Sequence, residues 1–448
     1  MFKKVLIANR GEIAVRVIRA CRELGLKTVA VFSTADRTAL HAQIADEAVC
    51  IGSPATKDSY LNEKAIIAAC EITGADAVHP GFGFLSENAA FARNCEKCGI
   101  TFIGPSPESI EMLGDKAAAK EAMKNAGVPV IPGSDGAVKS IDEAKKLAEE
   151  IGFPLMVKAS AGGGGRGIRL VERAEDLVTR IEEAQQEAKN YFGYDSIYME
   201  KFIVNPKHIE IQILADKQGN VIHLGERDCS MQRRNQKVLE ESPSAIMTPQ
   251  LRERMGRAAV AAAKVCGYYN AGTIEFLVDD EQNFYFMEMN TRIQVEHPIT
   301  EFVTGVDLVK AQLKIAAGKS LPYSQADICI KGHSIECRIN AESPEHNFRP
   351  SPGTINALHI PGGPGIRIDS SAYQGYTITP YYDSMIAKLI VYAPTREEAI
   401  AKMKWALAEF IVEGVDTNID FQLSLIRDPV FESGKYDIGY LGRRGKEQ

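Results

Sequence analysis

The sequence predicts a multidomain protein of α/β and α+β structure. We expect a parallel α/β domain at the N-terminus, then a small glycine-loop domain, then a mixed antiparallel domain at the C-terminus. The 448 residues exceed what one hydrophobic core usually organises. Residues 3–104 alternate short apolar runs with helix-like patterns, which is typical of βαβ units. Residues 204–300 carry strand-like alternation broken by polar turns, which indicates antiparallel hairpins.

The N-terminal elements follow from this alternation. We expect strands at 3–8, 28–33, 75–79 and 101–104, and helices at 13–24, 60–73 and 88–97. The turn between the first strand and the first helix reads Asn-Arg-Gly-Glu and not Gly-x-Gly-x-x-Gly. A dinucleotide-binding fingerprint is therefore absent at this turn.

Proline and glycine clusters mark the predicted domain limits. The segment 127–133, Gly-Val-Pro-Val-Ile-Pro-Gly, interrupts a helix-rich stretch and is a plausible linker. A second Pro-Gly-rich bend lies at 361–365, inside a region that mixes helices and strands. We expect an N-terminal domain at 1–114, a helical linker at 115–130, a glycine-loop domain at 131–203 and a C-terminal domain at 204–448.

Composition excludes several classes of protein. The net charge of −7 disfavours nucleic acid or an anionic membrane as a partner. The apolar run at 5–8 is too short for a secretory signal, and no run approaches the roughly 20 residues of a membrane helix. Nine scattered cysteines, with one CxxC at Cys95 and Cys98, indicate reduced thiols and no zinc site. We expect a cytoplasmic protein.

Four successive glycines at 162–165 lie between two strand-like apolar runs. The N–H groups of a glycine run can approach an anion closely, because no Cβ intervenes. Strands on both sides predict the tip of a hairpin, which differs from the strand-loop-helix of a Walker A loop. Lys158 and Arg166 bracket the loop and favour phosphate binding. A flexible loop without a ligand is the alternative.

A second candidate site is acidic. Glu288 and Asn290 share one face of a predicted strand, and Glu275 lies on the neighbouring strand across a hairpin turn at 279–283. Three hard oxygen donors suit Mg²⁺, which takes carboxylates, waters and nucleotide phosphates. A solvent-facing strand edge is an equally good interpretation.

A third pattern follows directly. Arg292, Gln294 and Glu296 are spaced at i, i+2 and i+4, so an extended chain would present them on one face. A cation, an amide and a carboxylate together form a pocket for a small oxyanion such as bicarbonate, with a base beside it. The alternative is a surface ion pair between Arg292 and Glu296.

Three other polar patterns have plain structural interpretations. His208, Glu210 and Gln212 alternate with isoleucines, which predicts a half-buried strand with a polar outer face unless that face lines a cleft. The segment 227–237 holds four positive charges and is expected to be a solvated charge run unless it lines a nucleotide pocket. Lys124 follows Ala-Met, as in biotin-attachment sequences, but its alanine-rich helical setting argues against biotinylation.

In combination and in order, these strings resemble the biotin carboxylase family of the ATP-grasp superfamily. The matching text is Lys-Lys-Val-Leu-Ile-Ala-Asn-Arg-Gly-Glu-Ile-Ala from residue 3, His-Pro-Gly-Phe-Gly-Phe-Leu-Ser-Glu-Asn from 79, the tetraglycine loop, Glu-Met-Asn-Thr-Arg-Ile-Gln-Val-Glu-His-Pro from 288 and Tyr-Tyr-Asp-Ser-Met-Ile-Ala-Lys-Leu-Ile from 381. The resemblance covers nearly the whole chain. It implies an ATP-grasp fold and the ATP- and bicarbonate-dependent carboxylation of biotin on a carrier protein through carboxyphosphate.

The resemblance also implies a role for each matching residue. ATP contacts are implied for Lys116, Lys158, Gly164, Gly165, Glu200, Lys201, Phe202, Ile203, His208, Gln232 and Asn235. Ligands of two Mg²⁺ ions, for which Mn²⁺ can substitute, are implied for Glu275, Glu288 and Asn290. A bicarbonate pocket is implied for Lys237, Arg292, Gln294 and Val295, with Glu296 as general base. Arg338 matches the arginine that stabilises the biotin enolate, and Phe82 lies beside the biotin site.

The implied partners are a biotin carboxyl carrier protein, carboxyltransferase subunits and a second copy of the chain. The stand-alone subunit most often serves acetyl-CoA carboxylase, which starts fatty-acid synthesis. A pyruvate carboxylase or another acyl-CoA carboxylase is the alternative.

Two positions depart from the family pattern. Asn235 stands where a histidine is usual, and Phe82 where a tyrosine is common. Neither is a metal ligand or the base, so we expect retuned substrate binding without loss of activity.

Two other functions compete. A different ATP-grasp ligase, of purine-pathway or carbamoyl-phosphate type, should lack the Arg-Ile-Gln-Val-Glu-His string. A catalytically silent ATP-binding subunit is disfavoured because every metal and base position holds a competent side chain.

Overall fold

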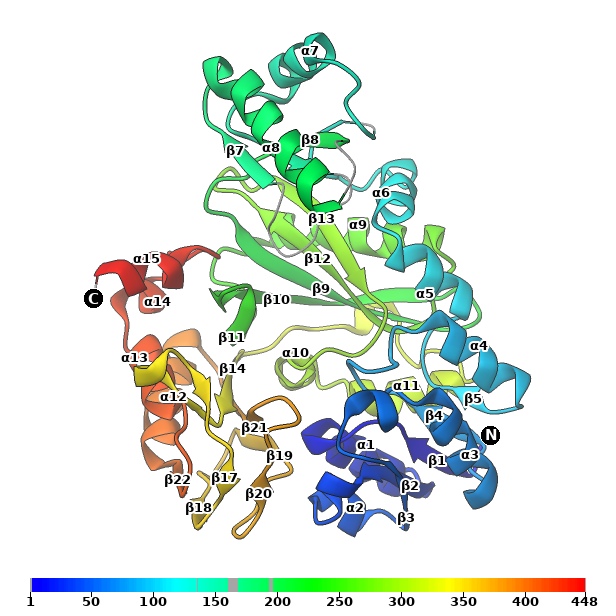
Figure 1. Ribbon diagram of the computed structural model, residues 1–448. Coiled ribbons are helices and arrows are strands. Elements are labelled where there is room, and N and C mark those ends of the chain that lie inside the picture. The colour runs from blue at the N-terminus through cyan, green and yellow to red at the C-terminus, as the bar shows by residue number, and fades with distance from the viewer. Residues whose placement is uncertain (1, 135, 160–167, 193–195, 448) are drawn as a thin grey trace. The chain divides into compact units, whose positions relative to one another are not determined.

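The N-terminal region forms a parallel sheet in the order β3-β2-β1-β4-β5 (Figure 1). The computed structural model describes residues 2–134, 136–159, 168–192 and 196–447. The strands of this sheet are β1 (Lys4–Ile7), β2 (Lys27–Ser33), β3 (Glu47–Gly52), β4 (Ala77–His79) and β5 (Thr101–Phe102), and its helices are α1 (Gly11–Glu23), α2 (Leu40–Ile44), α3 (Glu63–Thr73), α4 (Ala89–Lys97) and α5 (Pro107–Gly114). The predicted parallel sheet is confirmed. The edge strand β3 has no counterpart among the expected elements; it is largely exposed, and Ile51 is its one buried residue.

The apolar run of strand β1 is unbroken because both faces of the strand are buried. Val5 and Ile7 pack into one core cluster, with α1 and the later helix α11 (Leu308–Ala316). Leu6 and Ala8 pack into another, with α3 and α4. Helices therefore cover both faces of the sheet, as parallel strands require.

The chain divides into two compact units. The first comprises Met1–Val128, Lys207–Phe276 and Glu288–Gln448, and the second comprises Pro129–Pro206 and Leu277–Met287. The domain limits expected from the sequence stay a prediction.

The second unit is built on a three-stranded antiparallel sheet in the order β7-β6-β8. Its elements are α7 (Ile141–Ile151), β6 (Leu155–Ala159), β7 (Ile168–Val171), α8 (Leu177–Phe192) and β8 (Ile197–Lys201). The two helices and the strands bury a common core that includes Leu155, Val157 and Met199. Strands β6 and β7 pair antiparallel, as the hairpin prediction requires. The glycines themselves, Gly164 and Gly165 included, lie outside the described residues.

An eight-stranded sheet organises the rest of the molecule. Its order is β13-β12-β9-β10-β11-β14-β21-β19. The strands are β9 (Lys207–Ala215), β10 (Val221–Arg233), β11 (Gln236–Ser242), β12 (Asn270–Val278), β13 (Phe284–Asn290), β14 (His333–Asn340), β19 (Ile366–Ser370) and β21 (Met385–Ala393). Antiparallel pairing is established for β9–β10, β10–β11, β11–β14, β14–β21 and β19–β21.

The remaining elements of this region are helices and short strands. The helices are α6 (Lys116–Asn125), α9 (Pro249–Val265), α10 (His297–Thr304), α12 (Arg396–Glu409), α13 (Ile419–Ile426), α14 (Pro429–Ser433) and α15 (Tyr440–Glu447). The short strands are β15 (Glu342–Ser343), β16 (Arg349–Pro350), β17 (Gly353–Thr354), β18 (Ala357–His359), β20 (Thr377–Ile378) and β22 (Ile411–Glu413). Helix α9 interrupts the region expected to be antiparallel, so that expectation was incomplete. Lys124 lies on α6, in agreement with its helical pattern.

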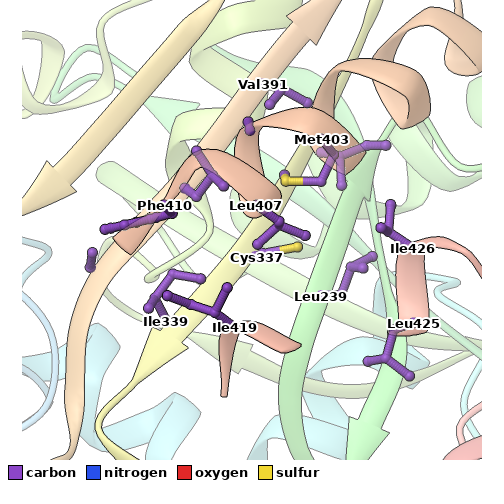
Figure 2. Close-up of a cluster of buried hydrophobic side chains, with 14 of the residues drawn as sticks. Leu239, Cys337, Ile339, Val391, Met403, Leu407, Phe410, Ile419, Leu425 and Ile426 are labelled. Carbon is purple, nitrogen blue, oxygen red and sulfur yellow. The ribbon is translucent and has the colours of Figure 1, made fainter. Parts of the chain in front are cut away.

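Alternation along β11, β14 and β21 divides the sheet into an apolar face and an ionic face. Leu239, Cys337 and Val391 point to the apolar side, where helices α12 and α13 cover them, as Figure 2 shows. Met403 and Leu407 of α12 fill the layer between helix and sheet. The intervening residues of the same strands carry the charges described below. Within the described part of the chain, no helix has the length and apolarity needed to span a membrane.

Candidate functional site

Buried charges gather on the ionic face of the eight-stranded sheet. Glu240 of β11, Glu336 and Arg338 of β14 and Lys388 of β21 are adjacent on it: Glu240 pairs across the strands with Glu336, and Arg338 pairs with Lys388. Glu240, Glu336 and Lys388 are fully buried. Helix α10 packs over β10, β11, β14 and β21, so water is largely excluded from this face.

Glu296 lies at the start of α10, where the chain leaves β13. Its Oε1 accepts a hydrogen bond from Lys237 Nζ at 2.6 Å, and its Oε2 accepts one from Arg338 Nη2 at 3.0 Å. Burial by itself would raise the pKa of this carboxyl. The charges of Lys237, Arg338 and Arg227 outweigh burial and hold the pKa well below its ordinary value. Glu296 is therefore an ionised, buried carboxylate.

The expectation of an extended chain through Arg292, Gln294 and Glu296 is wrong. Strand β13 ends at Asn290, and the chain then turns into α10, with Glu296 as the residue before the helix. His297 and Pro298 open the helix, and a proline in the first turn favours this helix start. The side chains of Arg292, Gln294 and Glu296 therefore extend from a turn, and each contacts different partners.

Arg292 does not pair with Glu296 as the ion-pair alternative supposed. Its Nε donates to Glu87 Oε2 at 2.9 Å, and its Nη2 donates to Asn290 Oδ1 at 2.8 Å. Gln294 lies deeper, and its Nε2 donates to Glu275 Oε1 at 2.8 Å. Glu87 was not among the expected site residues, and no sequence pattern connects it with Arg292.

Lys237 connects three carboxylates. Its Nζ lies 2.6 Å from Glu210, 3.0 Å from Glu275 and 2.6 Å from Glu296. Burial alone would lower the pKa of Lys237, but the surrounding acidic groups raise it well above the ordinary value. The lysine is thus a fixed cation beside the base.

Arg227 is the residue that the sequence interpretation missed. The segment 227–237 was expected to be a solvated charge run, yet Arg227 is fully buried. It lies directly across from Glu210 on β9, pairs with that carboxylate, and donates to Gln212 Oε1 at 2.6 Å and Gln294 Oε1 at 2.7 Å. The outer-face prediction for His208, Glu210 and Gln212 is wrong for the same reason, because all of β9 is buried. The pairing of β9 with β10 places this arginine opposite a glutamate. Knowledge of that pairing would have predicted the buried ion pair.

A candidate metal centre adjoins this network. His208, Glu210 and Glu275 each offer one ligand atom, and the three atoms lie within 4.8 Å of one another. Asn290 Nδ2 donates to Glu275 Oε1 at 2.9 Å. The amide oxygen of Asn290 does not face Glu275, since it accepts from Arg292 Nη2. His208 Nε2 lies 3.0 Å from Glu275 Oε2, and Gln232 contacts the other ring nitrogen at 3.0 Å.

The charges of Glu275 and Glu288, next to this group, fit a divalent cation. Lys237 and His208 hold the pKa of Glu275 far below its ordinary value against the effect of burial. Partial desolvation and then the charge of Glu275 raise the pKa of Glu288. A dication coordinated by these carboxylates would remove that repulsion, because hard oxygen ligands are what Mg²⁺ takes.

Several expected site residues lie elsewhere, and their ligand contacts stay predictions. In the second unit, Lys158 Nζ donates to Glu200 Oε2 at 2.6 Å, so a cation and a carboxylate of the expected set do meet there. Lys201 ends β8, and Phe202 and Ile203 follow it. Lys116 is the exposed first residue of α6.

Asn235 and Phe82, the two positions that differ from the family pattern, lie in a turn and against a core cluster, respectively. Asn235 occupies the two-residue turn between β10 and β11 with φ +63°, a conformation that asparagine adopts readily. Phe82 is half-buried and packs against the core cluster of α1 and α11. Val295 lies in the turn before α10.

Comparisons with known proteins agree over the whole chain. The family "Biotin carboxylase, N-terminal domain" matches residues 1–110, "Carbamoyl-phosphate synthase L chain, ATP binding domain" matches 115–324, and "Biotin carboxylase C-terminal domain" matches 336–443. Biotin carboxylase 1 of Bacillus subtilis is 58% identical over 442 residues, which is 98% of each chain. The chain belongs to the biotin carboxylase family.

Solved structures of biotin carboxylases share this fold. One is the biotin carboxylase domain dimer of the Hydrogenobacter thermophilus 2-oxoglutarate carboxylase, in complex with MgADP, ADP and bicarbonate. It is 56% identical, has a TM-score of 0.89 and covers 99% of this chain and 98% of its own. Another is the biotin carboxylase subunit of a pyruvate carboxylase, at 56% identity and a TM-score of 0.92, with 100% and 99% covered. The chain is accordingly an ATP-dependent ligase with the three-part biotin carboxylase architecture.

Proposed function

We propose that the chain uses ATP and bicarbonate to carboxylate biotin held on a carrier protein, with Glu296 as the general base. The observation that carries this proposal is the setting of Glu296. It is a buried, ionised carboxylate held between Lys237 and Arg338, two residues from Gln294 and its contact with Glu275. A small anion that enters this site would meet cations and a base together.

The base and the two cations beside it have different roles in the proposed reaction. Glu296 accepts the proton of bicarbonate, and the resulting anion attacks the γ-phosphorus of ATP to form carboxyphosphate and release ADP. Lys237 and Arg338 stabilise the charge that develops on the bicarbonate oxygens. Bound bicarbonate would also draw these cations toward itself, which raises the pKa of Glu296 and makes it a stronger base.

Carboxyphosphate then breaks down to CO₂ and phosphate. Phosphate or another base removes the ureido proton of biotin, and Arg338 stabilises the enolate so that N1′ attacks CO₂. The water-poor face under α10 would protect the intermediate from hydrolysis. Mg²⁺ would be held by Glu275, Glu288 and Asn290, and its chemistry there is to neutralise the charge of the nucleotide phosphates.

The assignment of the base is tested by Glu296→Gln. We expect ADP release that depends on biotin and bicarbonate to fall at least about 100-fold, because a positioned base contributes roughly that factor or more. ATP binding measured by calorimetry should stay close to that of the original protein. Glu253→Gln on the exposed side of α9 is the matched control. If the original protein releases no ADP in response to biotin, the chain is another ATP-grasp ligase, and if Glu296→Gln retains turnover, the base is a different residue.

We further propose that the carboxyl group passes to acetyl-CoA. Relatives named biotin carboxylase without another acceptor support this proposal. Relatives from 2-oxoglutarate and pyruvate carboxylases are equally similar, so identity alone does not select it. Affinity purification of the chain from its own cells, followed by transfer of labelled bicarbonate to acetyl-CoA, pyruvate or 2-oxoglutarate, distinguishes the three. Label in pyruvate or 2-oxoglutarate and none in acetyl-CoA would overturn the proposal.

A further inference from the structure

Lys388 is a charged side chain with no exposed surface, and the reaction outlined above does not use it. Its side chain is 0% exposed, and its Nζ donates to the carbonyl oxygen of Val295 at 2.8 Å. The same nitrogen lies 3.2 Å from Glu12 Oε1 in the first turn of α1 and 3.8 Å from Asp369. A buried cation is costly unless it is paired, and here the pairing includes a backbone carbonyl.

The position of Lys388 on the sheet explains what it reaches. It pairs directly across the strands with Arg338, so both side chains emerge side by side on the ionic face. Arg338 donates to the side chain of Glu296, and Lys388 donates to the backbone of the preceding residue. Two neighbouring cations of one sheet thus hold the same dipeptide at two different points.

The rest of this turn is also anchored through polar groups. The carbonyl oxygen of Gln294 lies 2.8 Å from Nδ1 of His297, and the Gln294 side chain is held by Arg227 and Glu275. Gln294, Val295 and Glu296 lie between β13 and α10 and have no strand ladder of their own. The Val295 carbonyl has its hydrogen bond from Lys388, which therefore connects the turn to the sheet.

We propose that Lys388 is a positioning residue, whose bond to the Val295 carbonyl holds Glu296 and the adjacent bicarbonate pocket in register with Arg338. The inference rests on the proposed function, because it concerns the same base. Glu12 is one of three acidic groups that keep the lysine charged: burial alone would lower the pKa of Lys388, and Glu12, Glu336 and Asp369 raise it. Loss of the bond would let the turn shift relative to Arg338 and Lys237.

The test removes the bond without leaving a buried charge. Lys388→Met alone would leave Glu12 unpaired and could prevent folding, so it is combined with Glu12→Gln. Asp369 keeps its pairing with Arg367 in this double variant. We expect the KM for bicarbonate to rise about tenfold or more and kcat to fall, with the KM for ATP within about twofold, because small misplacements at a reacting centre cost up to roughly 100-fold. A merely structural role would lower the active fraction, and thus kcat, without changing the KM for bicarbonate.

Arg396→Met combined with Glu241→Gln is the matched control. Arg396 is a partly buried cation that also pairs with a carboxylate, at 2.7 Å, and donates to backbone carbonyls, those of Phe431 and Glu432. We expect a similar loss of stability and an unchanged KM for bicarbonate. Glu12→Gln alone retains the bond to Val295 and should also keep this KM.

The proposal is overturned if the folded Lys388→Met, Glu12→Gln protein binds bicarbonate with the original KM. It is also overturned if Glu12→Gln alone raises the KM as far as the double variant does. Lys388→Gln in the Glu12→Gln background is the second variant, because its side chain is one bond shorter than lysine and its amide ends short of the carbonyl. If the proposed function itself fails, the original protein shows no bicarbonate-dependent turnover, which is a different result.

Discussion

Single residues of the ionic face show how the surroundings set the charge of chemically identical groups. Glu296 and Glu240 both accept hydrogen bonds from Arg338, at 3.0 Å and 2.7 Å. Burial raises the pKa of Glu240 to about 7, with Arg338 opposing and Glu296 adding to the effect. Glu296 has two further cations, Lys237 and Arg227, and its pKa moves the opposite way. Two carboxylates around one arginine can therefore differ in protonation near neutral pH.

The metal centre yields a prediction at this scale. Glu275→Gln removes a negative charge from the proposed Mg²⁺ ligands Glu275, Glu288 and Asn290. We expect the Mg²⁺ concentration for half-maximal activity to rise at least about tenfold, because charge on the ligands dominates the affinity for hard cations. Activity measured across a Mg²⁺ titration checks this, with Glu253→Gln as the control. An unchanged titration curve would place the metal elsewhere.

At the scale of elements, the turn between β13 and α10 and the start of α9 illustrate how local signals act. Helix α9 begins where Thr248 Oγ1 accepts the N–H of Leu251 at 3.1 Å, and Pro249 occupies the first turn. These residues form an N-cap that a residue-by-residue inspection can recognise. The turn before α10 has no comparable side-chain cap, since Glu296 directs its carboxylate to Lys237 and Arg338.

The cap of α9 can be tested by itself. Thr248→Ala should lower the free energy of unfolding by about 1 kcal/mol, because the N–H of Leu251 loses its acceptor. Urea denaturation measures the change, and Thr248→Ser should restore most of the loss. The kinetic constants for bicarbonate and ATP should not change, because α9 supplies none of the expected site residues.

At the scale of the whole molecule, buried histidines couple folding to pH. His79 has no exposed surface; the N–H of Gly81 donates to its Nδ1, and its Nε2 faces Gln312 Oε1 at 3.2 Å. These contacts suit the neutral ring. Burial lowers the pKa of His79 to about 4, and burial also lowers that of His41 to about 4.

These shifts predict the direction of the pH dependence. Between about pH 4 and 6.5 the unfolded chain binds protons that the folded chain does not, so stability rises with pH in this window and is fully present above it. Each such histidine contributes up to about 1.4 kcal/mol per pH unit. We expect His79→Gln to reduce the slope of unfolding free energy against pH between 5 and 6.5. A slope equal to that of the original protein would contradict this account.

The sequence by itself determined the parallel N-terminal sheet, the hairpins around the acidic residues and, through continuous family strings, the enzyme class. Local periodicity and turn chemistry carry this information, because they act between residues close in the chain. Val5 and Ile7 alternating with Leu6 and Ala8 is an example, since the run of apolar residues already requires cover on both faces.

Only the tertiary structure decided which charges are buried together. Arg227 was expected to be solvated and is fully buried opposite Glu210, Glu296 begins a helix where an extended chain was expected, and Lys388 reaches a carbonyl 93 residues away. The physical reason is that strand register and helix packing bring these groups together across long separations. A charged residue has the same local pattern on a solvated strand and on a covered one, and only the packing of α10 over the sheet distinguishes the two.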